Sequence, residues 1–150
     1  MFQHLLVPLD GSEYAERALT YAEKLAERFG SRLSLLSVLL RPVSPGAPRI
    51  SRLDEQSRER LKGELEGTAA EVRERSGLQA VQTDVCFGEP AEQIMEFAQS
   101  HGVDLIVMST HGLGATGRYA LGSVALKVLM TAPCPVFMVR IPSQPQMGAP

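Results

Sequence analysis

The segment from Ser109 to Ser123 has the residue types and spacing of a phosphate-binding loop. It holds four glycines between an apolar run and a helical pattern. Because glycine has no Cβ, the backbone of such a loop can approach a phosphate closely. The N–H groups of Gly122, Ser123 and Val124 would be free at the start of the helix, where the helix dipole also favours an anion. The sequence therefore predicts that phosphate groups bind here.

This loop is neither of the two common nucleotide-binding motifs. A P-loop has the pattern GxxxxGK[ST] after the first strand. The residues from Gly112 to Gly117 spell GxGxxG, but they follow the fourth apolar run instead of the first. Arg118 could pair with a phosphate or lie in solvent, and His111 has no evident partner nucleophile for acid–base catalysis. The glycines could also serve only tight turns in a chain that binds nothing.

Short apolar runs alternate with longer amphipathic segments along the chain, as in proteins with helices on both faces of a parallel sheet. The expected strands cover residues 4–9, 32–40, 80–87, 104–109 and 135–140. The expected helices cover residues 12–29, 51–75 and 122–131, with one more between Pro90 and Gly102. The pattern predicts a doubly wound α/β domain, Rossmann-like, with a five-stranded parallel sheet. Ligands bind beyond the carboxyl ends of such strands. That rule selects four loops, which follow Leu9, Leu40, Phe87 and Ser109.

Apolar residues at intervals of three and four predict which side of each long helix is buried. On helix 12–29 the expected buried residues are Ala15, Leu19, Ala22, Leu25, Ala26 and Phe29. On helix 51–75 they are Leu53, Leu61, Leu65, Ala69 and Val72. Ser12 suits the N-cap of the first of these helices. His4 and His101 are interpreted as strand-edge and helix-end residues that belong to no cluster.

The composition limits the class of protein. The 150 residues carry a net charge of -2 and are 44% hydrophobic, which is ordinary for one globular domain and gives no basic surface for nucleic acid. No apolar run approaches the roughly 18 residues of a membrane span, and the first apolar run is too short for a secretion signal and lacks a basic segment before it, so a cytoplasmic protein is expected. Cys86 and Cys134 lack metal-site spacing and are expected to be buried, reduced thiols. The residues from 142 to 150 are expected to form a disordered tail, which leaves a domain of residues 1–141.

Three further motifs point to a known family. Val7-Pro8-Leu9-Asp10-Gly11-Ser12 resembles the first-strand signature of the universal stress proteins, and the segments 104–112 and 121–125 resemble the ATP-binding loop of that family. The segment 132–136 is similar to its entry into the last strand. The family loop has a glycine, two residues, a second glycine, nine residues, and then Gly-Ser or Gly-Thr. Gly112 and Gly122-Ser123 fit this pattern, and Ser109 stands where the first glycine would be.

This resemblance, which runs from about residue 2 to residue 140, implies a strand order of 3-2-1-4-5 and ATP with Mg²⁺ as ligands. It implies that Asp10 accepts a hydrogen bond from a ribose hydroxyl, although Asp10 could instead only begin a turn and help to cap the helix. The backbone of Val38 would read the adenine edge. The remaining residues are implied in nucleoside contacts (Pro8, Leu9), ribose contacts (Met108, Ser109) and phosphate contacts (Gly112, Gly122, Ser123, Val124). Magnesium would bridge phosphate oxygens, since one carboxylate plus substrate is its usual coordination.

Three functions remain open at this point. The resemblance favours an ATP-binding module that acts in the stress response. A slow ATPase or phosphotransferase is the second possibility, and a scaffold that binds no nucleotide is the third. The resemblance also places the last strand at a sheet edge, where its apolar residues would pair two copies in a homodimer. These residues are Val136, Phe137, Met138 and Val139. Neither nucleic acid nor a membrane is an expected partner.

Overall fold

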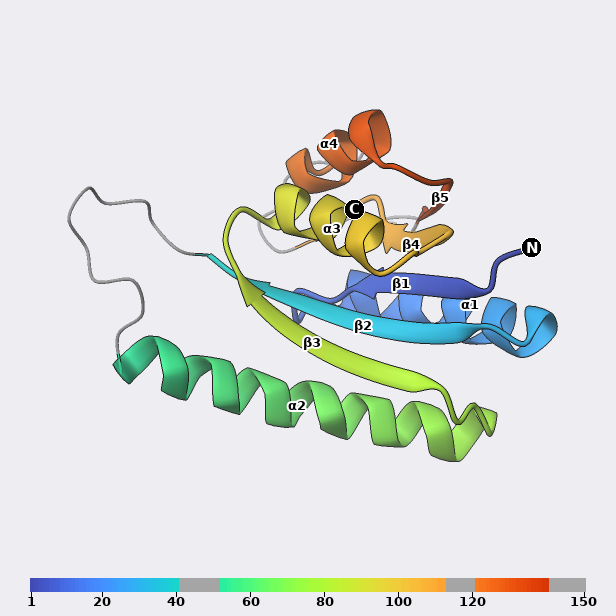
Figure 1. Cartoon of the computed structure of the whole chain (residues 1–150), viewed down its shortest axis with the longest axis horizontal. Helices are drawn as coiled ribbons and strands as arrows, with labels where there is room; N and C mark the ends of the chain where they lie inside the picture. Colours follow the sequence, from blue (N-terminus) through green and yellow to red (C-terminus); the bar gives the residue numbers. More distant parts are fainter. Residues whose placement is uncertain (41–51, 113–120, 141–150) are drawn as a thin grey trace, which may run out of the picture.

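The computed structural model describes residues 1–40, 52–112 and 121–140 (Figure 1). Its strands are β1 (His4–Pro8), β2 (Arg32–Leu39), β3 (Val81–Phe87), β4 (Leu105–Ser109) and β5 (Val136–Val139). Its helices are α1 (Glu13–Phe29), α2 (Arg52–Ser76), α3 (Pro90–Ser100) and α4 (Ser123–Thr131). The expected loop at 41–49, most of the glycine loop with Arg118, and the expected tail lie outside the described residues.

The strands form one parallel sheet in the order β3-β2-β1-β4-β5, which confirms the expected fold class and strand order. β1 is the central strand, and Leu5 pairs with Leu33 of β2 on one side and with Leu105 of β4 on the other. The described elements begin and end within about one residue of the expected bounds. Leu9, expected inside the first strand, lies just beyond β1 and donates its N–H to Leu36 at 2.8 Å. Because all the strand pairs are parallel, the carboxyl ends of the strands lie at the same edge of the sheet.

Successive strand residues point to opposite faces, and helices cover both faces (Figure 1). Leu5 and Val7 pack in a core layer with α1 and α2, whereas Leu6 packs in a second layer with α3 and α4. The central strands are apolar on both sides for this reason. The two core layers thus position the strand ends at the carboxyl edge of the sheet.

Side-chain and proline caps set where the helices begin. Ser12 Oγ accepts a hydrogen bond from the N–H of Ala15 at 3.2 Å, as expected of an N-cap. Glu89 caps α3 in the same way and accepts from the N–H groups of Ala91 and Glu92. Pro90 follows in the first turn, where a missing N–H costs nothing. These caps fix α1 and α3 just after the ends of β1 and β3.

Two residues expected to be buried are exposed. Phe29 is 46% exposed because it is the last residue of α1, where its ring packs edge to face with Phe2, 5.4 Å away between centroids. Leu53 is 74% exposed because α2 packs on the sheet through its later turns, from Leu61 to Val72, and its first turn lies outside that contact. The spacing of apolar residues thus predicted burial correctly in the middle of α1 and α2, but wrongly at the end of α1 and at the start of α2.

The interpretation of His4 as a strand-edge residue is wrong. β1 is the central strand, and His4 is only 3% exposed. Its Nε2 lies 2.7 Å from Ser34 Oγ, and its Nδ1 lies 3.1 Å from the carbonyl oxygen of His101. Burial lowers the pKa of His4, although the His101 carbonyl opposes that shift. His4 and Ser34 therefore form a buried polar pair at the amino end of the sheet, opposite the carboxyl edge of the strands.

The cysteines are free, as expected, but only partly buried. Burial raises the pKa of the Cys86 thiol and of the Cys134 thiol, so both resist ionisation. Within the described ranges, no group of three His, Cys, Asp or Glu side chains could hold a metal ion. No helix in the same ranges is long and apolar enough to cross a membrane.

Candidate functional site

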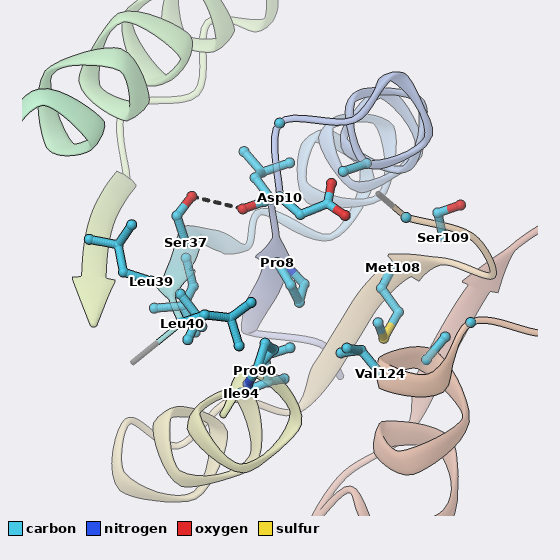
Figure 2. A pocket seen from close by; sticks show the side chains of 18 of the residues that line it. Pro8, Asp10, Ser37, Leu39, Leu40, Pro90, Ile94, Met108, Ser109 and Val124 are labelled. Atoms are coloured by element: carbon cyan, nitrogen blue, oxygen red, sulfur yellow. Dashed lines mark hydrogen bonds between the residues drawn. The ribbon is translucent and has the colours of Figure 1, made fainter. Parts of the chain in front are cut away.

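A cavity of about 540 Å³ lies at the carboxyl edge of the sheet, between the ends of β1, β2 and β4 and the starts of α3 and α4 (Figure 2). This is the point where the strand order reverses between β1 and β4. The volume is within the usual range for small-molecule sites. The cavity is lined by all the residues that the sequence analysis named as candidates for nucleotide binding: Pro8, Leu9, Asp10, Val38, Met108, Ser109, Gly112, Gly122, Ser123 and Val124.

Asp10 occupies the turn after β1 and faces Gly112, which follows β4. One oxygen, Oδ1, accepts a hydrogen bond from the N–H of Ser12 at 2.9 Å, so the carboxylate does support the turn into α1. A Cβ added at Gly112 would overlap Asp10 Oδ2. Glycine at 112 therefore lets two loops from neighbouring strands come into contact, and it leaves Asp10 in the cavity wall. The helix-capping and ligand-binding interpretations of Asp10 are compatible, because the residue supports the turn and also lines the cavity.

The start of α4 forms another part of the wall. Gly122 is the N-cap residue with a φ of -58°, so it does not use the left-handed region that would demand glycine. Its N–H donates to the carbonyl oxygen of Thr110 at 2.8 Å, and the expectation that this N–H is free is wrong. The turn that closes the loop uses that donor. No side chain caps α4, and among the described residues no acceptor meets the N–H groups of Ser123 and Val124. These two donors remain for an anion.

Apolar side chains surround the middle of the cavity (Figure 2). They come from the sheet edge and from both helices that flank it, and they include Pro8, Leu40, Pro90, Ile94, Met108 and Val124. The Ser37 hydroxyl donates to the carbonyl oxygen of Leu9 at 2.8 Å and ties β2 to the end of β1. Such a space suits a flat, mostly apolar group with few polar contacts.

Sequence reasoning missed several residues of this wall. Leu40 and Pro90 lie in or just after two of the four loops selected by the strand-end rule, so the rule itself could have found them. Ile94 lies one turn further into α3 and is 2% exposed. Leu61 and Glu64 of α2 also line the cavity. Nothing in the sequence indicates this, because it depends on where α2 crosses the sheet.

The described lining carries negative side chains, Asp10 and Glu64, and no lysine or arginine. Lys127, one turn into α4, lies outside the lining and pairs with Glu89 at 3.2 Å and with Glu92 at 3.6 Å. Burial acts to raise the pKa of Glu89, but the Glu92 N–H and Lys127 outweigh it, and the pKa is lowered overall. Within the described residues, an anion would thus be held by backbone N–H groups and the α4 dipole, not by a cationic side chain.

The segment after β4 is held by its own hydroxyls. Ser109 Oγ accepts a hydrogen bond from the N–H of His111 at 3.2 Å. Thr110 Oγ1 lies 2.9 Å from Nδ1 of the His111 ring, and that ring lies against Tyr14 of α1, 5.6 Å between centroids. Ser109 therefore fixes the turn that carries His111 and Gly112 into the cavity wall.

The fold is a doubly wound α/β domain, and a cavity of the size of a small-molecule site lies where its strand order reverses. Comparison with known proteins is more specific. The model of the universal stress protein family matches residues 1–140, and the chain belongs to that family.

Individual relatives agree with this assignment. A universal stress protein of Thermus aquaticus is 37% identical over 142 residues, which cover 93% of this chain and 100% of the relative. The solved structure of the universal stress protein UspA from Lactobacillus plantarum is 28% identical, covers 93% of this chain and 98% of its own, and has a TM-score of 0.80. A universal stress protein from Archaeoglobus fulgidus, solved in complex with dAMP, is 24% identical with a TM-score of 0.65, and the match covers 92% of this chain and 98% of that one.

Proposed function

We propose that this chain binds ATP together with Mg²⁺ and acts in the cytoplasm as a nucleotide-dependent binding module of the stress response. The observation that carries the proposal is the make-up of the cavity. Apolar walls line its middle, while Asp10 beside Gly112 and the uncapped start of α4 provide the polar groups. A nucleotide has the same three parts, namely a flat base, a ribose and an anionic phosphate chain.

The residues present fit such a ligand. Asp10 would accept a hydrogen bond from a ribose hydroxyl, close to Met108 and Ser109. The N–H groups of Ser123 and Val124 would hold phosphate oxygens, because a helix start offers both unsatisfied donors and a favourable dipole. The base would lie among the apolar side chains near Val38. The absence of a Cβ at Gly112 keeps this part of the wall open, since a side chain there would displace Asp10.

Magnesium would be bound mainly through the phosphates. Mg²⁺ keeps several waters and usually takes one or two carboxylates plus substrate oxygens. When bound, it neutralises phosphate charge, which matters in a cavity whose described lining is acidic. The dAMP complex of the Archaeoglobus relative supports an adenine nucleotide as the ligand class.

Two other functions need to be separated from this one. Efficient phosphoryl transfer needs a positioned base and a cationic clamp. The described lining holds no lysine or arginine, so we expect turnover far below the roughly 1–100 per second of kinases. A scaffold without nucleotide would follow if Ser109, in place of the first loop glycine, prevented binding. A phosphate-release assay separates the binder from the enzyme, and steady release at kinase-like rates would favour the enzyme.

Thermal unfolding tests the proposal against the scaffold. A ligand with a micromolar dissociation constant, supplied at 1 mM, stabilises a folded protein by about 4 kcal/mol. We therefore expect ATP with magnesium to raise the midpoint of unfolding by several degrees, and we expect GTP to raise it less. An unchanged midpoint with every adenine nucleotide would favour the scaffold.

The proposal includes a homodimer built through β5. In the described structure β5 pairs only with β4. The carbonyl oxygens of Pro135 and Val139 accept hydrogen bonds from the N–H groups of Ile106 in β4 and of Thr110 just after it. Because the backbone groups of alternate residues point to the same side of a strand, those of Val136 and Met138 point to the open edge. An antiparallel match of two such edges is self-complementary about a two-fold axis. Phe137 flanks this edge and is 40% exposed.

Light scattering at micromolar concentration should give twice the chain mass of 16.3 kDa. Phe137→Lys should shift the protein toward the monomer, because lysine on an edge strand discourages pairing. Leu53→Lys, which changes an exposed leucine on α2, is the matched control and should leave the mass unchanged. Val139 is not a useful probe, since it is only 4% exposed and a lysine there would disturb the core. A monomeric parent would refute the dimer.

A further inference from the structure

His111 is held in the cavity wall by contacts that fix its ring. Nδ1 lies 2.9 Å from Thr110 Oγ1, and the ring lies against Tyr14. The backbone N–H of the same residue donates to Ser109 Oγ at 3.2 Å. Among the described residues, no partner meets the other ring nitrogen, Nε2. An oriented ring with one unsatisfied nitrogen beside a ligand cavity is arranged to contact a ligand.

The position of His111 indicates which part of a ligand it would meet. The residue before it, Thr110, accepts the N–H of Gly122 through its carbonyl oxygen at 2.8 Å. His111 therefore adjoins the start of α4, where the N–H groups of Ser123 and Val124 have no acceptor in the described structure. His111, Ser123 and Val124 all line the same cavity.

The contact with Thr110 also restricts the protonation states that suit an anion. If the threonine hydroxyl donates to Nδ1, the neutral ring carries its proton on Nε2. If the ring is an imidazolium, Nδ1–H donates to the threonine and Nε2–H is again a donor. Only the remaining tautomer presents a lone pair on Nε2. An anion beside the ring would therefore select the states in which Nε2 donates.

We propose that His111 is a phosphate-binding residue, which donates a hydrogen bond from Nε2 to a phosphate oxygen of the nucleotide and is oriented by Thr110 and Tyr14. The inference rests on the proposed function, because it needs a phosphate at the α4 end of the cavity. It adds a side-chain donor to a site whose other described anion donors are backbone groups.

Two substitutions separate the two ring nitrogens. The amide nitrogen of asparagine can replace Nδ1, whereas that of glutamine reaches the position of Nε2. By calorimetry, His111→Asn should lower the affinity for Mg–ATP about tenfold, as expected for one lost hydrogen bond to a charged group. His111→Gln should stay within about threefold of the parent, since it retains a donor at that position. The affinity for adenosine, which carries no phosphate, should be the same in all three proteins.

Two changes at Tyr14 test how the ring is oriented. Tyr14→Leu removes the aromatic partner and should weaken ATP binding but not adenosine binding, while Tyr14→Phe keeps the partner and should behave as the parent. Thermal unfolding of each variant shows whether the fold is retained. Equal ATP affinity in the parent and in His111→Asn would overturn the role of His111 alone. An equal loss of ATP and adenosine would also overturn it, because the contact would then not be to phosphate. A parent that binds no ATP would overturn the proposed function itself.

Discussion

Replacing Gly112 by alanine should lower the affinity for ATP by about 10- to 100-fold while the protein stays folded. The added Cβ would overlap Asp10 Oδ2. The carboxylate must then turn aside and leave its place in the cavity wall, which also disturbs the hydrogen bond that it accepts from the Ser12 N–H. The expected loss equals that of the contact between Asp10 and the ribose, which is a hydrogen bond to a charged group. Calorimetric titration measures the loss, and circular dichroism checks the fold.

A double-mutant cycle shows whether the two residues act together. Asp10→Ala should weaken ATP binding to a similar extent, and adding Gly112→Ala to it should cost little more, because no carboxylate remains to be displaced. If Gly112→Ala lowers the affinity for ATP by the same factor in the parent and in Asp10→Ala, glycine at 112 does not act through Asp10. Unchanged binding by Gly112→Ala alone would contradict the assignment of Asp10 to the ribose.

The pairing of Asp10 with Gly112 shows what the sequence could and could not predict. Both residues follow predicted strands, and the strand-end rule placed their loops at one edge of the sheet. Whether they touch depends on the strand order, which here came from a family resemblance and not from periodicity. The exact approach of the two loops depends on packing between residues distant in the chain. Sequence reasoning therefore identified the members of the site but not the contact that makes glycine necessary.

Gly122→Val should reduce ATP binding by about tenfold or more, while adenosine binding is retained. A Cβ at this position would lie 3.3 Å from the carbonyl oxygen of Thr110, which is tighter than an ordinary contact. That carbonyl accepts the Gly122 N–H, so the branched side chain would push the start of α4 away from the end of β4. The donors of Ser123 and Val124 would move with it, and phosphate would lose its site.

Calorimetry with ATP and with adenosine distinguishes this result from general damage. Gly67→Val is the matched control, because Gly67 lies on α2, outside the cavity lining, and a Cβ there meets open space. The control should bind ATP as the parent does. If Gly122→Val is folded and binds ATP normally, the phosphate does not lie at the start of α4.

Gly122 also illustrates why the sequence alone was insufficient. Its type and its place before a helix correctly predicted the end of the loop and the start of α4. They could not reveal that its φ is negative, or that Thr110 already accepts its N–H. The same limit applies to His4, whose burial follows from the central position of β1, and to Val139, whose burial follows from which side of β5 faces α1. Local patterns set the elements, whereas the neighbours of each element decide which polar groups are satisfied.

The central claim is that the cavity binds an adenine nucleotide through both its apolar walls and the start of α4. Titrating the full chain with Mg–ATP in a calorimeter tests this claim most directly. We expect one site per chain and a micromolar dissociation constant, which corresponds to a binding free energy on the order of -8 kcal/mol. Adenosine should bind more weakly, since it leaves the α4 donors without a phosphate. The absence of heat, together with no thermal shift at millimolar ATP, would contradict the claim.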